Sequence, residues 1–251
     1  MDLGLSGQVY VVTGGSRGLG RATAAALVAE GARVVTSARD AERVQEAVAA
    51  LGGSGRAVGT VADLADPAAP GRLVDLALET FGRLDGALVS VGGPPPATAA
   101  GASDEQWRAA FESVFLGAVR TARTVAARLT EGGAIGLVLS GSARSPITGL
   151  GISNGLRPGL AMVAKDMADE FGPRGVRVVG LLPGRIATDR MVQLDEAGGP
   201  GARERAVAGI PLGRYGEPDE FGRTAAFLLS PAASYVTGSL VAVDGGASRA
   251  L

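Results

Sequence analysis

Short β-branched runs alternate along this chain with longer stretches of helical period, and no other feature constrains its fold as strongly. Parallel strands need crossover helices, so the alternation predicts an α/β fold in which a doubly wound parallel sheet of about seven strands carries helices on both faces. The expected strands cover residues 8–12, 33–37, 56–61, 84–90, 134–139, 177–182 and 240–243, and the expected helices include 19–30, 40–51 and 103–129. Because no break in composition divides the chain, residues 1–251 are expected to form a single domain.

The balance of charge argues against two classes of partner. The chain has 24 basic and 25 acidic side chains and a net charge of −1, which leaves no positive surplus for nucleic acid or anionic lipid. Residues 224–243 carry no charge, but Pro231 and Gly238 lie among them, so this stretch is expected to be core and not a membrane span. The first residues, Met1 to Gly4, do not resemble a secretory leader, and the sequence therefore predicts a cytoplasmic protein.

Cysteine and histidine are both absent from the sequence. Their absence excludes disulfides, thiolate nucleophiles and imidazole proton carriers, and no cluster of Asp and Glu suggests a metal site. Lys165 is the only lysine among the 24 basic residues. A mechanism that needs a lysine would have to use this one.

A glycine-rich turn, Thr13 to Gly20, follows the first expected strand and leads directly into the first expected helix. Gly14 permits a tight turn, Gly18 lets the backbone approach a pyrophosphate, and Gly20 allows the helix to pack closely on the strand. The free N–H groups and the positive dipole end of the helix then face the phosphates. In this position the turn predicts Rossmann-like dinucleotide binding through Gly14, Ser16, Arg17, Gly18, Leu19 and Gly20.

The end of the second expected strand favours NADP(H) over NAD(H). An acidic residue there would bond the adenosine ribose 2′-hydroxyl and repel a 2′-phosphate, but Thr36 to Arg39 contains none, and the first acid is Asp40. Arg39 and Arg17 could hold the 2′-phosphate through their guanidinium groups. Each could equally be a solvated surface arginine.

Two segments, residues 92–96 and 189–209, interrupt the rhythm of strands and helices, and both follow strand ends, where open α/β sheets bind ligands. The second is expected to be a long substrate loop. Together with residues 144–152 these segments are expected to form the substrate pocket. The apolar side chains in these segments favour a small, largely apolar ligand. These side chains are Pro94, Pro95, Ile147, Leu150, Met191 and Val192. Ile147 and Val192 could equally be ordinary packing residues.

The sequence resembles the short-chain dehydrogenase/reductase family over nearly its whole length. Thr13 to Gly20 is similar to that family's Thr-Gly-x-x-x-Gly-x-Gly turn, residues 172–178 and 183–184 are similar to its approach to the nicotinamide, and residues 211–214 and 236–246 are similar to its C-terminal signature. The resemblance implies that Asp63 and Leu64 contact the adenine and that Thr188 meets the carboxamide. It also implies further cofactor contacts at Gly92, Pro183, Gly184 and Ile186.

The catalytic centre departs from the family pattern. That family uses an Asn, a Ser, and a Tyr followed four residues later by a Lys. Alignment without gaps puts Ser140 at the Ser position, but Ser153 at the Tyr position, Arg157 at the Lys position and Val114 at the Asn position. Arg157 shares a helical face with Ser153 and can still hold the nicotinamide ribose and present positive charge. Ser153 has neither the reach of a phenol nor a pKa near ~10.

Two features complicate the start of the helix that carries Ser153. Ser153 is either a helix cap or a catalytic hydroxyl, and the two roles are compatible. Pro158 follows closely, and because proline fits only the first turn of a helix, the helix should begin close to Arg157 or kink there.

Together these features predict an NADP(H)-dependent carbonyl reductase or alcohol dehydrogenase, with Ser140, Ser153 and Arg157 as an atypical centre and a small apolar carbonyl or alcohol as substrate. A protein in which the bound nucleotide is structural or sensed is the alternative hypothesis, and a non-redox enzyme on the same scaffold is a third. The resemblance further implies that the helix expected over residues 103–129 pairs with a second subunit in a homotetramer or homodimer.

Overall fold

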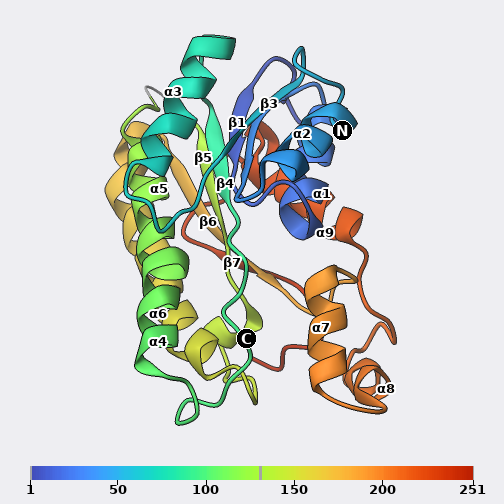
Figure 1. The fold of residues 1–251 in the computed structure, drawn as a ribbon. Helices are drawn as coiled ribbons and strands as arrows, with labels where there is room; N and C mark the ends of the chain where they lie inside the picture. The colour runs from blue at the N-terminus through green and yellow to red at the C-terminus, as the bar shows by residue number, and fades with distance from the viewer. Residues whose placement is uncertain (1, 130–131, 251) are drawn as a thin grey trace.

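The computed structural model describes residues 2–129 and 132–250. Within these residues seven parallel strands form one sheet in the order β3-β2-β1-β4-β5-β6-β7, which confirms the predicted Rossmann-like fold class (Figure 1). The strands are β1 (Val9–Val12), β2 (Arg33–Ala38), β3 (Ala57–Val61), β4 (Gly86–Val89), β5 (Ala134–Val138), β6 (Arg177–Pro183) and β7 (Leu240–Val243). All seven lie at predicted positions, with ends that differ by two residues or fewer.

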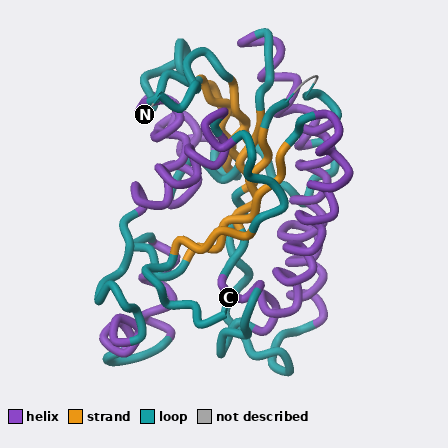
Figure 2. The backbone as a smooth tube through the Cα atoms, turned by 180° about the vertical axis from the view of Figure 1, so that it is seen from behind, coloured by secondary structure: helices purple, strands orange, loops and turns teal. Residues whose placement is uncertain are grey.

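Helices cover both faces of the sheet. They are α1 (Gly18–Ala29), α2 (Ala41–Ala50), α3 (Ala69–Phe81), α4 (Asp104–Ala110), α5 (Gly117–Ala126), α6 (Gly151–Phe171), α7 (Asp189–Ala197), α8 (Ala202–Ala208) and α9 (Pro218–Leu229). One face carries α3, α5 and α6, and the other carries α1, α2 and α9 (Figures 1 and 2). No helix in the described part of the chain is long and apolar enough to span a bilayer.

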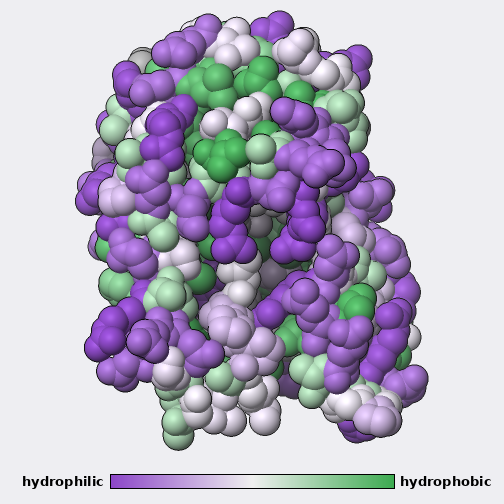
Figure 3. Space-filling view, in the orientation of Figure 1, coloured by the Kyte–Doolittle hydropathy of each residue, from purple (hydrophilic) through white to green (hydrophobic). Residues whose placement is uncertain are grey.

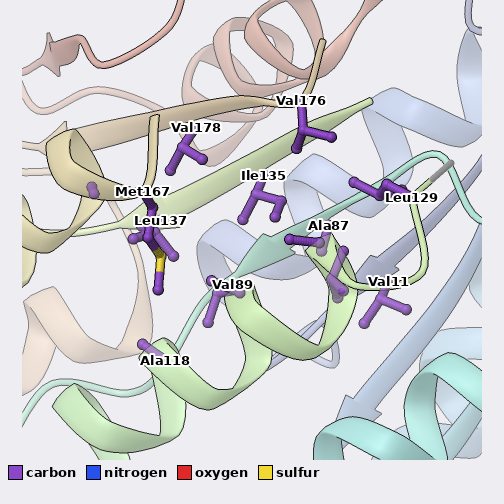
Figure 4. Packing of buried hydrophobic residues seen from close by; sticks show 14 of the residues in the cluster. Val11, Ala87, Val89, Ala118, Leu129, Ile135, Leu137, Met167, Val176 and Val178 are labelled. Carbon is purple, nitrogen blue, oxygen red and sulfur yellow. The ribbon is translucent and has the colours of Figure 1, made fainter. Parts of the chain in front are cut away.

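Burial on both faces explains why the central strands are continuously apolar. All residues of β1 and β5 are buried, as expected for parallel strands between two helical layers. On one face, Val11, Ile135 and Leu137 of the sheet pack under Ala118 of α5 and Met167 of α6 (Figure 4). The strands therefore hold their carboxyl ends in fixed positions, and these ends carry the candidate site.

The helix expected over residues 103–129 is present without a gap over residues 104–126, but its hydrogen-bonding pattern changes in the middle. A π-helical segment, Phe111–Leu116, separates α4 from α5. No proline marks the interruption in the sequence. The structure shows close packing just after it, because a Cβ on Gly117 would lie 2.5 Å from the carbonyl oxygen of Leu64. Val114, at the position of the family Asn, is buried within the π-helical segment. Such segments often occur at functional sites.

The expectation that a helix begins near Arg157 is wrong. Helix α6 begins at Gly151 and runs through Pro158, whose ring is exposed. Gly151 sets this start, because its N–H donates to the carbonyl of Ala97 at 2.7 Å and a Cβ there would collide with the backbone of Ala99. The cap interpretation of Ser153 is also wrong, since the residue before the helix is Leu150 and Ser153 lies inside the first turn.

Residues 189–209 are mostly helical and do not form the long loop that was expected. They form α7 and α8, which lie beside the main body of the fold (Figure 1). The run Gly198 to Gly201 is the turn between the two helices, where Gly199 and Gly201 have φ of 71° and 72°. The glycines that suggested a loop therefore form the short turn between two helices.

Candidate active site

The glycine-rich turn is bound tightly to the neighbouring strand ends. Gly14 has φ of 58°, and a Cβ there would lie 2.6 Å from the carbonyl oxygen of Ser90, which follows β4. The Thr13 hydroxyl donates to the Ser90 carbonyl and accepts from the Ser90 N–H, both at 2.9 Å. A Cβ on Gly15 would collide with the hydroxyl of Thr36 in β2. Side chains larger than hydrogen would therefore open this turn.

The start of α1 leaves room for an anion. Gly18 opens the helix with φ of 54°, which favours glycine. Among the described residues, no side chain caps this end at Arg17 and no acid lies in the first turn. Only glycine fits at position 20, because a Cβ there would collide with the carbonyl of Gly14. Uncapped N–H groups at the positive end of the helix dipole, beside a cradle that side chains would fill, fit a dinucleotide pyrophosphate.

The residues expected at the adenosine end follow β2 and β3. Arg39 is exposed just after β2, and the neighbouring Ser37 carbonyl accepts the N–H of Gly15 at 3.0 Å. Asp63 is exposed after β3 and holds its own turn, accepting from the N–H of Ala65. Leu64 is buried and packs under α5.

Thr188 faces the glycine turn from the other side. The Cγ2 atom of Thr188 would lie 3.6 Å from a Cβ placed on Gly18. The Thr188 hydroxyl donates to the carbonyl of Ile186, and Ile186 is a buried residue. Arg17 lies 3.8 Å from the carboxylate of Asp189, and both side chains are mostly exposed. Pro183 is the last residue of β6 and Gly184 follows it, so both lie at the carboxyl end of that strand, while Gly92 is exposed after β4.

Two serine hydroxyls meet between the segment after β5 and α6, and a third serine, Ser140, lies two residues before one of them. Ser140 follows β5, and its hydroxyl accepts the N–H of Ser142 at 3.2 Å. The Oγ atoms of Ser142 and Ser153 are 2.9 Å apart and buried, and either one can donate. The sequence singled out Ser140 and Ser153 but missed Ser142, because only the short 3-10 turn Gly141–Ala143 turns this side chain toward α6.

Arg157 lies one turn beyond Ser153 and is almost fully buried, at 4% exposure. Its Nη1 donates to the carbonyl of Val138 in β5 at 2.7 Å, and its buried Nε has no partner among the described residues. Burial lowers the pKa of Arg157 to about 10, so the guanidinium remains charged at neutral pH. It places a positive charge behind the serine hydroxyls.

Asn154 is another residue that the sequence did not single out. Its side-chain oxygen accepts the N–H of Ile147 and its amide donates to the carbonyl of Ile147, both at 2.9 Å. These paired bonds fix the segment before α6, where residues 144–152 were expected to form one wall of the substrate pocket.

A cavity of about 230 Å³ lies where α7 and α8 meet the segment after β6. Asp195 on its wall accepts from Arg185 at 2.9 Å and from the Tyr215 hydroxyl at 2.8 Å. Arg203 stacks on the Tyr215 ring, 4.6 Å from its centroid. This network holds α7 in place. Within residues 2–129 and 132–250, no group of three or more metal-ligating side chains gathers here or elsewhere.

Comparisons with known proteins identify relatives that match nearly the whole chain. A family model described as enoyl-(acyl carrier protein) reductase matches residues 14–248. L-rhamnose 1-dehydrogenase (NAD(P)(+)) of Azotobacter vinelandii is 36% identical over 249 residues, which cover 95% of this chain and 96% of that protein. The crystal structure of L-sorbose reductase from Gluconobacter frateurii, complexed with NADPH and L-sorbose, is 32% identical with a TM-score of 0.92 and full coverage of both chains. A short-chain dehydrogenase/reductase of the glucose/ribitol dehydrogenase type from Brucella melitensis is 28% identical, with a TM-score of 0.93 and the same coverage.

Proposed function

Because the chain belongs to the short-chain dehydrogenase/reductase family of oxidoreductases, we propose that it is an NADP(H)-dependent enzyme that interconverts a carbonyl and an alcohol at an atypical hydroxyl centre. The observation that carries the proposal is the buried pair of Ser142 and Ser153 hydroxyls, 2.9 Å apart, which adjoins Ser140 at the end of β5. Ser153 is the member of this pair that aligns with the family tyrosine in the sequence.

The cofactor half of the site retains what a dinucleotide needs. Gly14, Gly18 and the uncapped start of α1 supply a close backbone and a positive dipole for the pyrophosphate. We assign Arg39 and Arg17 to the 2′-phosphate, for which they supply charge, and Asp63 and Leu64 to the adenine. We assign Gly92, Pro183, Gly184, Ile186 and Thr188 to the nicotinamide side. The bound nicotinamide supplies or accepts the hydride.

The chain's own residues then handle the oxygen of the substrate. Ser140 is half-buried and can donate a hydrogen bond to a carbonyl oxygen, which polarises the carbonyl. As hydride adds to the carbonyl carbon, that oxygen takes a proton that is passed from water through the hydroxyls of Ser142 and Ser153. The buried charge of Arg157 stabilises the developing alkoxide. Such a relay lacks part of the ~10²–10⁴-fold acceleration that a positioned acid contributes.

Reduction of a panel of activated ketones and aldehydes by the purified protein with NADPH, followed by absorbance, tests this function. We expect slow turnover that Ser140→Ala abolishes while NADPH affinity stays unchanged. The triple variant Ser153→Tyr, Arg157→Lys, Pro158→Ala should raise the rate, because it restores a phenol beside a lysine.

If the parent and the triple variant both bind NADPH and neither turns over any compound in the panel, the nucleotide is structural or sensed, and the proposal is wrong.

A further inference from the structure

Arg190 connects the two chain segments that flank the proposed catalytic centre. It lies in the first turn of α7, after β6, and its Nη2 donates to the carbonyl oxygen of Pro94 at 2.6 Å. Pro94 belongs to the segment after β4, and β5 lies between β4 and β6 in the sheet. The side chain therefore crosses from one side to the other of the strand end that carries Ser140.

The guanidinium of Arg190 lies beside the backbone of Gly93. A Cβ on Gly93 would lie 3.5 Å from Nη2 and 3.6 Å from Nε of Arg190, so the guanidinium lies against a bare backbone. The Pro94 carbonyl accepts from Nη2 alone. A guanidinium has five N–H donors arranged in a fork, and the remaining donors can bind a carboxylate in bidentate fashion.

The charge of Arg190 is uncompensated. No ion pair within residues 2–129 and 132–250 includes it, although it is half-buried and burial lowers its pKa. The two nearest carboxylates in the sequence are engaged elsewhere, Asp189 with Arg17 and Asp195 with Arg185. The surface around α7 and α8 is largely hydrophilic on the face that Figure 3 shows.

We propose that Arg190 binds a carboxylate of the substrate, so that the substrate is an oxo acid, or its hydroxy acid in the reverse direction. This inference rests on the proposed function and deepens it, because it names the group that the pocket recognises beside the reacting carbonyl. It also revises the expectation of a largely apolar ligand. A half-buried guanidinium without an ion-pair partner favours an anion over a neutral ligand of the same shape.

The test compares oxo acids with their neutral esters, which carry the same carbonyl. Pyruvate, acetoacetate and levulinate and their methyl esters are reduced with NADPH, because the distance from carboxylate to carbonyl varies along this series. At least one acid should have a KM about tenfold or more below that of its ester. Arg190→Gln should raise the KM of that acid to the ester value and leave the ester unchanged, whereas Arg190→Lys should recover part of the difference.

A matched control is Arg174→Gln. Arg174 also donates to a backbone carbonyl, that of Ala126 at 3.1 Å. It precedes β6, however, and so lies at the amino end of that strand, whereas Arg190 follows its carboxyl end. Arg174→Gln should change neither the KM of the acid nor the KM of the ester. Calorimetric titration of the same acids into the protein saturated with NADP⁺ gives a readout that needs no turnover, and Arg190→Gln should abolish the binding of the preferred acid.

Two failures are distinguishable. If acids and esters have equal KM values, or if Arg190→Gln weakens both equally, the carboxylate proposal is overturned while the oxidoreductase stands. If no compound turns over but the acid still binds in calorimetry through Arg190, the proposed function fails and the anion site stands.

Discussion

At the scale of single residues, Ser142 changes how the substituted centre is understood. A lone Ser153 at the tyrosine position would be a poor acid, but in the buried pair one hydroxyl donates to the other, which leaves the second proton available to the substrate oxygen. Sequence spacing identified Ser140 and Ser153, since both align with family positions. It could not identify Ser142, because the family pattern assigns no role there and its orientation depends on the turn after β5.

Removing the Ser142 hydroxyl should therefore slow catalysis without affecting binding. We expect Ser142→Ala to lower kcat about tenfold and to leave the KM for the ketone and the Kd for NADPH unchanged, because only the proton route is broken. Ser142→Thr, which retains a hydroxyl, should recover most of the rate. Ser145→Ala removes an exposed hydroxyl from the same segment and serves as the control in steady-state kinetics. An unchanged kcat in Ser142→Ala would show that the pair is only structural.

The preference for NADP(H) depends on two exposed arginines. We expect Arg39→Ala to weaken NADPH binding about tenfold, because a charge-assisted contact with the 2′-phosphate contributes ~1.5–3 kcal/mol, and to leave NADH binding unchanged. Arg17→Ala should act in the same direction. Calorimetry with both nucleotides checks this, with Arg43→Ala on α2 as the control. A preference for NADPH that survives the double variant would overturn the assignment.

At the scale of elements, the strands were predictable and the segments between them less so. Apolar runs identify β1 and β5 because both faces of a parallel sheet are buried. The early start of α6 was not predictable, because it depends on a long-range contact between Gly151 and the segment after β4. The π-helical segment before α5 and the helices between residues 189 and 208 were missed for a similar reason. Local glycine and proline signals mark where a helix can break, and tertiary packing decides whether it does.

The start of α9 should make stability dependent on acid pH. Glu220 accepts both guanidinium nitrogens of Arg214, at 2.7 and 2.8 Å, and also the N–H of Glu217 at 2.7 Å. The Arg214 bond first, and the Glu217 bond next, lower the pKa of Glu220 to about 2. Because the folded pKa lies below the unfolded value, this carboxylate stabilises the fold above about pH 4.5, and the contribution disappears as the pH falls toward 2.

Glu220→Gln should therefore melt at a lower temperature than the parent at neutral pH, and the difference should shrink as the pH falls from about 4.5 toward 2. Thermal unfolding followed by circular dichroism measures this, with Glu79→Gln on α3 as the exposed control. A difference in Tm that stays constant across this range would contradict the assignment.

At the scale of the whole molecule, apolar side chains on α6 and in the π-helical segment point to self-association. Phe111 is 44% exposed and Met162 is 71% exposed, and the Phe111 and Phe115 rings stack at 5.3 Å. We expect a homotetramer in which this face meets a second copy, because such surface is costly to leave in water. Light scattering should give four times the chain mass at micromolar concentration, and Phe111→Glu should reduce it. A monomer for the parent protein would contradict the prediction.

The whole fold also explains how a centre without tyrosine or lysine can stay organised. The glycine turn after β1, the hydroxyls after β5 and Thr188 after β6 all lie at the carboxyl edge of one sheet. Bonds between the neighbouring segments, such as those of Thr13 with Ser90 and of Arg190 with Pro94, hold that edge together. Cofactor, hydroxyls and substrate would therefore meet at one place, which is what direct hydride transfer requires.

The most direct test of hydride transfer uses NADPH that carries deuterium at C4 of the nicotinamide, prepared separately in each of its two stereochemical forms. The protein is incubated with each form and, in separate reactions, with an oxo acid and with its neutral methyl ester, and the alcohol product is analysed by mass spectrometry, which detects turnover too slow for absorbance. We predict that one form places deuterium on the carbinol carbon, that the other does not, and that Ser140→Ala abolishes the transfer. Absence of deuterium in the product from both forms, in a protein that binds NADPH, would contradict the proposed oxidoreductase activity.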